Sequence, residues 1–441
     1  MSVSLYAHII FKLGMVRFAT SLLVVLLTNV LNRVLIVEFQ TPATLIAFIF
    51  AFQHLATPSG LIAGYFSDRS RGGRRRTPYI VAGMLLSIAV MPFFPAWGWA
   101  FAADSQSPSL LWMGIGLFTL FGVGTTISAT AVNALLVDRI PEEQRGSGMT
   151  LVWLLTLAGF IVGSTFFSHL VSGNQIHRLE VIFWLFSGIA LAITFWSVRG
   201  VEVAGADDMV APVRLDGIGD ILMGFYRSSQ ARLFFLFLAA TVFFLAMQTF
   251  ILAPYGGVIL NLPVGETAIF GVYTSYGTLL GMGTAYWGQK KNPRLGDRFF
   301  LSAGLLLGAV AFGLFSLSSR GPNPAMGEAG LWLLGFAKGF FNAGISFLTM
   351  RLTHPSFSGV FMGLWNLISG LALAAGEMAG GFLLDQGVRL WGDLGVGYAM
   401  VFLAEALGLL GCLVMLRFIS VPTYWRQIAL QLGVRASQAQ Q

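Results

Sequence analysis

Long apolar stretches separated by short polar segments dominate this sequence. A helix needs about 20 apolar residues to cross the hydrocarbon core of a bilayer, and the chain contains twelve stretches of that kind. They begin near Val16, Thr41, Thr77, Leu110, Met149, Glu180, Arg232, Glu266, Phe299, Ala329, Phe357 and Val396. Because backbone groups in lipid must be hydrogen-bonded within the segment itself, the pattern predicts an all-α polytopic membrane protein with twelve transmembrane helices.

Composition supports lipid as the solvent for much of the chain. Of its 441 residues, 56% are hydrophobic and 10% are charged, whereas ordinary soluble domains are about a quarter charged. The single cysteine, Cys412, excludes an intramolecular disulfide. The first apolar stretch, Val16 to Val37, is too long for the core of a signal peptide, so we interpret it as a retained span.

The positive charges predict the orientation, because Lys and Arg concentrate in cytoplasmic loops. With the amino terminus inside, 21 of the 26 basic residues fall on the cytoplasmic side. An even number of spans then places both termini in the cytoplasm. The net charge of +7 is explained by this topology and by attraction to anionic lipid, and no segment is typical of a nucleic-acid-binding module.

A loop with five arginines follows the second span, between Gly64 and Arg76. Its glycine, acid and basic run resemble the signature loop of the major facilitator superfamily, with one residue inserted before the second glycine. The candidate residues of this cytoplasmic signature loop are Gly64, Asp68, Arg69, Gly72, Arg74 and Arg75. The resemblance implies a major facilitator superfamily fold with twelve transmembrane helices in two six-helix halves.

The loop after the second span is repeated after the eighth, from Gly288 to Arg298. The loop after the fourth span, Asp138 to Gly146, resembles the superfamily's second cytoplasmic loop and is repeated more weakly after the tenth, from His354 to Gly359, as expected for two similar halves. We place the N-terminal half at 1–199, a cytoplasmic linker at 200–231, the C-terminal half at 232–418 and a cytoplasmic tail at 419–441. Within the linker, Leu215, Ile218, Leu222 and Phe225 have helical spacing and predict a short interfacial helix. A plain connector is the alternative.

Charged side chains inside the apolar stretches are costly and mark candidate sites. Arg33 and Glu38 lie near the outer end of the first span, and Glu377 is expected at similar depth on the eleventh. They form either a structural ion pair or a ligand-contacting pair. Lys338 on the tenth span pairs with Glu405 on the twelfth, or alternatively binds an anionic group.

His54 lies near the middle of the second span, four residues before Pro58. Its imidazole suits axial ligation of a metallated tetrapyrrole, although a lone transmembrane histidine is more often an interhelical hydrogen-bonding residue. Asn29 and Asn32 on the first span are further candidates for contacting such a pigment. The chain contains no Walker loop, nucleophile elbow or metal-ligand cluster, so we expect no enzymatic activity, no nucleotide and no structural metal.

Four segments point to a specific family. They are Leu31 to Glu38 in the first span, Arg76 to Ile80 opening the third, Pro254 to Gly257 ending the seventh, and Gly363 to Trp365 with Gly380 to Asp385 along the eleventh. Together they resemble the PucC/LhaA family, also called the bacteriochlorophyll delivery family, over nearly the whole chain. One departure is that Ala253 stands where family members often carry an acid before the Pro-Tyr-Gly-Gly turn.

The resemblance implies a function in phototrophs. It implies an assembly factor that binds or delivers chlorophyll or bacteriochlorophyll to nascent pigment proteins in a thylakoid, intracytoplasmic or cytoplasmic membrane. The implied partners are the lipid bilayer, light-harvesting or photosystem polypeptides and chlorophyll-synthesis enzymes. The alternative is a secondary transporter that moves a small solute by alternating access.

Overall fold

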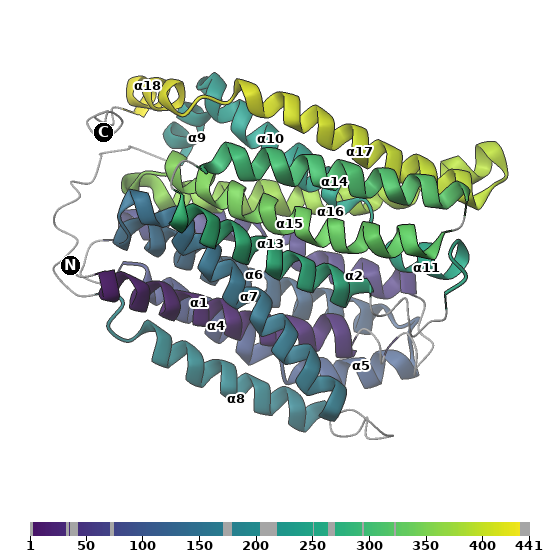
Figure 1. The fold of residues 1–441 in the computed structure, drawn as a ribbon. Helices are drawn as coiled ribbons and strands as arrows, with labels where there is room; N and C mark the ends of the chain where they lie inside the picture. Colours follow the sequence, from purple (N-terminus) through teal and green to yellow (C-terminus); the bar gives the residue numbers. More distant parts are fainter. Residues whose placement is uncertain are drawn as a thin grey trace. The chain divides into compact units, whose positions relative to one another are not determined.

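The computed structural model describes residues 3–31, 35, 43–70, 75–170, 179–202, 218–249, 251–262, 270–292, 295–321 and 323–432. Within these ranges the secondary structure is helical, without a strand (Figure 1). Ten helical segments of this described part are long and apolar enough to cross a membrane. The second and eighth predicted spans are also helical, but the former is broken in two and the latter is less apolar.

By internal contacts the chain divides into two units. The first comprises Met1–Pro141, Leu151–Pro212 and Thr353–Leu367, and the second comprises Glu142–Thr150, Val213–Leu352 and Ile368–Gln441. The division differs from two continuous halves, because a short segment from each half packs with the other unit. Thr353–Leu367, which includes the beginning of a long helix, therefore belongs to the first unit.

Helices of the first unit begin where proline or polar residues interrupt the apolar pattern. Pro58 and Pro108 are the first residues of their helices, where the missing N–H has no intrahelical partner in any case. Pro58 also explains why the second span is two helices. The helices are α1 (Val3–Val25), η1 (Leu26–Leu31), α2 (Ala43–Leu55), α3 (Pro58–Arg69), α4 (Thr77–Val90), α5 (Phe93–Ala103), α6 (Pro108–Arg139), most of α7 (Glu142–Leu170) and α8 (Leu179–Val198).

The first unit is held together by pairs of helices, chiefly α4 with α6 and α1 with α8. Glycine allows the α4–α6 crossing to be close, since a Cβ on Gly83 would lie 2.5 Å from the Gly124 carbonyl oxygen. Trp97 on α5 is buried, and its indole N–H donates to the Leu110 carbonyl on α6 at 2.8 Å. These contacts position α4 and α5 against α6.

The second unit contains the remaining helices. They are α9 (Ile218–Arg227), α10 (Ser229–Ala246), α11 (Leu252–Val258), α13 (Phe270–Lys291), α14 (Asp297–Arg320), α15 (Pro324–Leu352), most of α16 (Ser358–Trp391), α17 (Leu394–Phe418) and α18 (Val421–Leu432). The 3-10 turn η4 (Pro355–Phe357) precedes α16 and belongs to the first unit.

Small residues bring α13 and α15 into close contact. Gly277 and Gly281 on α13 face Gly335 and Gly339 on α15, and a Cβ on Gly339 would lie 2.4 Å from the Thr278 carbonyl oxygen. Glycines four residues apart let membrane helices approach closely, so that van der Waals packing can hold them together. α14 packs against both α15 and α17 (Figure 1).

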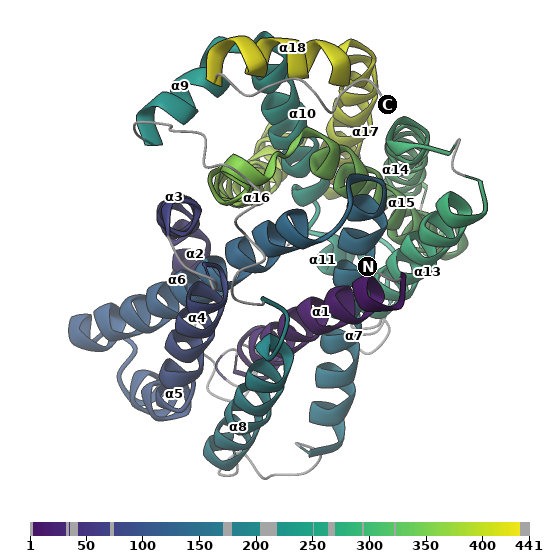
Figure 2. The ribbon, with the colours of Figure 1, turned by 90° about the vertical axis from the view of Figure 1, so that its left-hand side faces the viewer.

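Two amphipathic helices, α9 and α18, pack against each other and against α10 (Figure 2). α9 lies where the linker pattern predicted a short helix. The Gln427 side chain of α18 accepts hydrogen bonds from Ser228 Oγ at 2.8 Å and from the Gln230 backbone N–H at 3.0 Å. These bonds tie α18 to the beginning of α10.

Candidate functional site

A buried arginine lies at the centre of the most extensive polar cluster in the first unit. Arg76 is the residue before α4, and its side chain is fully buried. The guanidinium donates to Asp138 Oδ2 at 2.9 Å, to Asp68 Oδ1 at 2.5 Å, to Ser67 Oγ at 2.5 Å and to Ser358 Oγ at 2.7 Å. The five side chains come from α3, α4, α6 and α16, so Arg76 connects four helices.

Asp68, near the end of α3, holds the beginning of α16. It accepts hydrogen bonds from the backbone N–H groups of Gly359 at 3.0 Å and Val360 at 2.9 Å. A carboxylate is stabilised there because the first N–H groups of a helix have no intrahelical acceptor and carry partial positive charge. Gly64 makes the approach possible, since a Cβ at that position would lie 2.1 Å from the Gly359 carbonyl oxygen.

Asp138, the penultimate residue of α6, completes the cluster. Its Oδ2 also accepts from Arg75 Nη2 at 2.9 Å, and its Oδ1 accepts from the Ser358 hydroxyl at 2.9 Å. The Ser358 hydroxyl therefore accepts a hydrogen bond from Arg76 and donates one to Asp138.

Glu202 fixes the other side of Arg76 through the backbone. Its carboxylate is 2% exposed and accepts from the backbone N–H groups of Arg75 at 2.9 Å, Arg76 at 3.0 Å and Thr77 at 2.8 Å. These are the N–H groups that the beginning of α4 cannot satisfy within the helix. The chain directly after α8 thus caps α4 and orients the arginine.

The charges in the cluster are nearly balanced. The cluster contains three carboxylates and two guanidinium groups, and the N-terminal ends of α4 and α16 supply additional partial positive charge. Burial alone would lower the pKa of the Arg76 guanidinium, but Asp138 and Asp68 outweigh burial and raise that pKa above its ordinary value. Arg76 is therefore a permanent cation, and its removal would leave carboxylates buried with less compensation.

This arrangement is suited to holding helices together. Moving the beginning of α16 away from α3 would break both bonds to Asp68 and both bonds of Ser358. Among the residues that the structure describes, no group of three or more His, Cys, Asp or Glu side chains could hold a metal ion. We call the set Ser67, Asp68, Arg75, Arg76, Asp138, Glu202 and Ser358 the Arg76 cluster.

The second unit has an ion pair at the equivalent places in the repeat, with the charges exchanged. Asp297 is the first residue of α14 and Arg351 the penultimate residue of α15, and their side chains are 3.0 Å apart. Here the cation is half-exposed, with 49% of its side chain accessible, whereas Arg76 is fully buried. The Arg76 cluster of the first unit is therefore more deeply buried than the Asp297–Arg351 pair of the second, and it has more hydrogen bonds.

The predicted signature-loop residues have different environments. Gly64, Asp68 and Arg75 belong to the contacts just described. Arg69 is exposed, and its guanidinium contacts the Tyr65 ring with 5.1 Å to the centroid. Gly72 and Arg74 lie outside the described residues.

Several predicted intramembrane residues also lie outside the described part of the chain. Arg33, Glu38 and Asn32 are among them, and Asn29 is described only as part of η1. Glu377 lies half-buried on α16. The pairing of Arg33 with either glutamate therefore stays a prediction.

Lys338 on α15 and Glu405 on α17 both lie in the second unit. Glu405 is fully buried, and Lys338 and the Gln248 backbone N–H are the polar groups that act on its carboxylate. Neither of its oxygens reaches a hydrogen bond of ordinary length. The two charges interact electrostatically without a direct contact, and an anion-binding function for Lys338 stays a prediction.

His54 is the second-last residue of α2, next to the break that precedes α3. Its ring is partly exposed, and the nearest polar group is the Gln53 amide nitrogen, 3.4 Å from Nε2. Both residues are on the same helix. Among the described residues, no hydrogen bond from another helix to the imidazole is present.

The sequence analysis did not include five residues of the Arg76 cluster among the candidate site residues: Ser67, Arg76, Asp138, Glu202 and Ser358. The available signals were local. Arg76 directly precedes a Thr-Pro helix start, and Glu202 follows the sixth span within five residues. Asp138, Glu202 and Ser358, however, lie 62, 126 and 282 positions from Arg76 along the chain. Spacing within one helix could not identify such contacts.

The sequence matches the protein family described as "PUCC protein" over residues 30–423. The chain belongs to this family. It is 30% identical over 423 residues to Protein PucC of Rhodobacter capsulatus, covering 90% of this chain and 88% of that one. It is 29% identical over 420 residues to a Rhodobacter capsulatus protein named bacteriochlorophyll synthase 44.5 kDa chain, covering 90% of this chain and 92% of that one.

A solved structure supports the fold of this PUCC family member. A major facilitator superfamily transporter, FucP, in the outward conformation matches with a TM-score of 0.63 over 93% of this chain and 98% of that one, at 17% identity. An identity this low supports the fold and nothing more specific. The predicted major facilitator superfamily fold is therefore confirmed, as is the predicted family.

Proposed function

We propose that this PUCC family member is a non-enzymatic assembly factor for light-harvesting or photosystem complexes. It binds or delivers chlorophyll or bacteriochlorophyll to nascent pigment-binding membrane proteins. The observation that carries the proposal is the family match, which extends over nearly all of the transmembrane region. The names of two relatives at 29% and 30% identity connect them to bacteriochlorophyll and to PucC.

A membrane protein is physically suited to this function. Chlorophyll is apolar apart from its magnesium centre and the polar rim of the ring, so an apolar site with one nitrogen ligand can hold it. His54 is our candidate for that ligand, because its imidazole is partly exposed and weakly engaged. Asn29 and Asn32, on the first span, are candidates for contacting polar groups of the pigment.

In this proposal the protein resides in a photosynthetic membrane, either thylakoid or intracytoplasmic, or in the cytoplasmic membrane, with both termini in the cytoplasm. The Arg76 cluster then lies at the cytoplasmic side. There it holds the beginning of α16 in place while pigment or a partner polypeptide is bound. The proposed partners are light-harvesting or photosystem polypeptides and enzymes of chlorophyll synthesis.

The test is purification of full-length protein from a chlorophyll-making host in mild detergent, followed by an absorption spectrum and identification of associated polypeptides. We expect pigment to accompany the wild-type protein and His54→Phe to lower the pigment recovered per folded protein. His8→Phe is the matched control, because His8 is an exposed histidine on α1. Equal pigment in His54→Phe and wild type would remove His54 as ligand.

The second candidate function is secondary transport of a small solute, which the major facilitator superfamily fold favours. The same purification separates the two proposals. Transport would be favoured by two results together. The purified wild-type protein would carry neither pigment nor light-harvesting polypeptides, and a strain that lacks the gene would still assemble its light-harvesting complexes normally. Loss of those complexes in the deletion strain supports the assembly function.

A further inference from the structure

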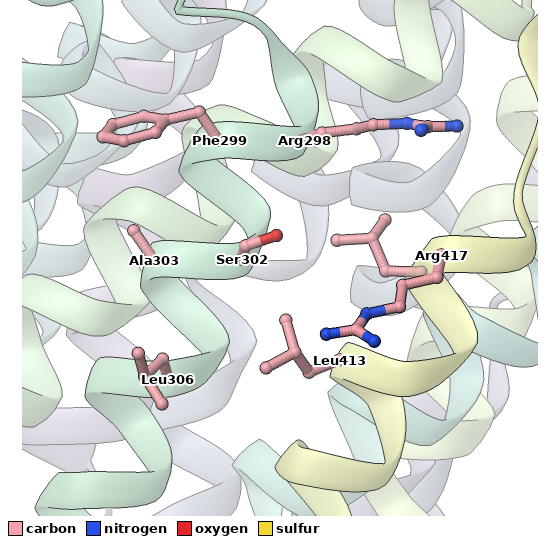
Figure 3. A pocket seen from close by; sticks show the side chains of 8 residues that line it. Arg298, Phe299, Ser302, Ala303, Leu306, Leu413 and Arg417 are labelled. Atoms are coloured by element: carbon pink, nitrogen blue, oxygen red, sulfur yellow. The ribbon is translucent and has the colours of Figure 1, made fainter.

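An apolar groove with two arginines lies in the second unit, away from the Arg76 cluster. It has a volume of about 590 Å³ and is formed by the first turns of α14 and the last turns of α17. Figure 3 shows Arg298 and Arg417 extending over the same space from opposite helices, with the Ser302 hydroxyl pointing into it. Both helices are candidate membrane spans, so the groove begins at a membrane surface.

The two arginines give this entrance an unbalanced positive charge. Both are exposed, and no carboxylate lines the groove. The neighbouring acid, Asp297, is already bound by Arg351 at 3.0 Å. None of the ion pairs between described residues involves Arg298 or Arg417.

Arg298 is held in position by one hydrogen bond, which its Nη2 donates to the Ile419 carbonyl at 2.6 Å, where the chain leaves α17. A guanidinium has five N–H donors, so this bond leaves others for an anion. The Ile419 contact thereby holds the Arg298 side chain in place without neutralising its charge.

Below the arginines the lining is apolar. Ala303, Leu306, Leu413 and Leu416 form the walls. From Arg298 to Leu306, α14 rises about 12 Å, at about 1.5 Å per residue. One leaflet of hydrocarbon is about 15 Å deep, half of the roughly 30 Å core. The groove therefore offers a charged surface followed by nearly one leaflet of apolar wall.

We infer that this groove binds an anionic phospholipid of the leaflet that Arg298 and Arg417 face. The phosphate lies between the two guanidinium groups, which form strong charge-assisted hydrogen bonds to phosphate oxygens. One acyl chain follows Ala303, Leu306 and Leu413 into the membrane. A zwitterionic headgroup binds less well, because its ammonium group meets two cations and no carboxylate.

Native mass spectrometry of the full-length protein in detergent tests this inference. Wild-type protein is mixed with phosphatidylglycerol or with phosphatidylcholine of the same acyl chains. We expect one tightly retained phosphatidylglycerol and no comparable phosphatidylcholine. Arg298→Gln/Arg417→Gln should weaken phosphatidylglycerol binding roughly 25-fold, since each arginine near anionic lipid contributes about fivefold.

Two further variants test separately how lipid binding depends on the position of the positive charges and on the shape of the groove. Arg320→Gln/Arg389→Gln removes two exposed arginines at the other ends of α14 and α16, and it should retain the lipid. Ala303→Trp fills the groove without changing the charge, and it should release the lipid. Elution as a single symmetric peak in size-exclusion chromatography establishes that each variant is folded.

The inference would be overturned by equal retention of phosphatidylcholine, by equal loss of lipid in the Arg320/Arg389 control, or by unchanged binding in both groove variants. Competition by glycerol 3-phosphate at the lipid's concentration would also overturn it, because a free phosphate site needs no acyl chain.

Discussion

Replacing Arg76 with leucine tests whether the Arg76 cluster is a principal source of stability in the first unit. The substitution removes the guanidinium bonds to Asp68, Asp138, Ser67 and Ser358 while leaving a side chain that fits an apolar space. Removing one partner of a buried ion pair costs about 3–5 kcal/mol. Nothing else in the cluster can supply the lost charge to Asp68.

The expected loss of stability for Arg76→Leu lies at the lower end of that range. Asp138 keeps its contact with Arg75, and Asp68 keeps the N–H groups of Gly359 and Val360. We therefore expect a loss of about 3 kcal/mol. The unit contains about 220 residues, and for domains near that size 1 kcal/mol shifts the Tm by about 2–4 °C. The Tm should fall by roughly 6 °C or more.

The assay is thermal unfolding of full-length protein in detergent, followed by tryptophan fluorescence at one fixed heating rate. Arg69→Leu is the control, since Arg69 is an exposed arginine seven residues earlier whose side chain contacts Tyr65. It should change the Tm by no more than about 1–2 °C. If Arg76→Leu unfolds within 2 °C of this control, the buried cluster does not contribute the stability assigned to it.

Three further substitutions test other contacts by the same thermal assay. Glu202→Ala leaves three N–H groups at the beginning of α4 without their acceptor, and it should cost about 2 kcal/mol; an unchanged Tm would contradict the capping function. Gly339→Val places a side chain against α13 and should lower the Tm or abolish folding, whereas Gly313→Val, where a Cβ meets nothing within 4 Å, should be tolerated. Arg33→Leu should reduce protein accumulation in the host far more than Arg426→Leu, because a charge within a span needs a partner; equal accumulation would argue against such a partner.

The fold could be predicted from the sequence because its determinants are local and strong. A stretch of about 20 apolar residues has few alternatives in lipid, and each of the twelve stretches contains helix in the described structure. Pro58 was noted in the sequence, but the break that it causes in the second span, between α2 and α3, was not predicted. The pattern of apolar residues continues across this break, so hydropathy alone could not reveal it.

The candidate site was predicted only in part, for a physical reason. Gly64, Asp68 and Arg75 could be selected because they belong to a recognisable loop. Arg76 could not be ranked above the other four arginines of that loop, because its burial depends on α6 and α16. Charge and size are the same for Arg75 and Arg76, and tertiary packing alone leaves 15% of the Arg75 side chain accessible while it buries Arg76 fully.

The position of Ser358 in the Arg76 cluster has a consequence for synthesis of the protein. Every other member has left the ribosome once Glu202 has emerged, yet Asp68 has no helix N-terminus to cap until Gly359 and Val360 follow. At about 5–20 residues per second, the intervening stretch of roughly 160 residues takes about 8–30 s to translate. During that interval Asp68, Asp138 and Arg76 lack their final serine and backbone partners. The contacts that complete the N-terminal bundle thus form only after a segment of the C-terminal half has been synthesised. If the gene were split between the two halves, the second polypeptide would have to supply that segment in trans.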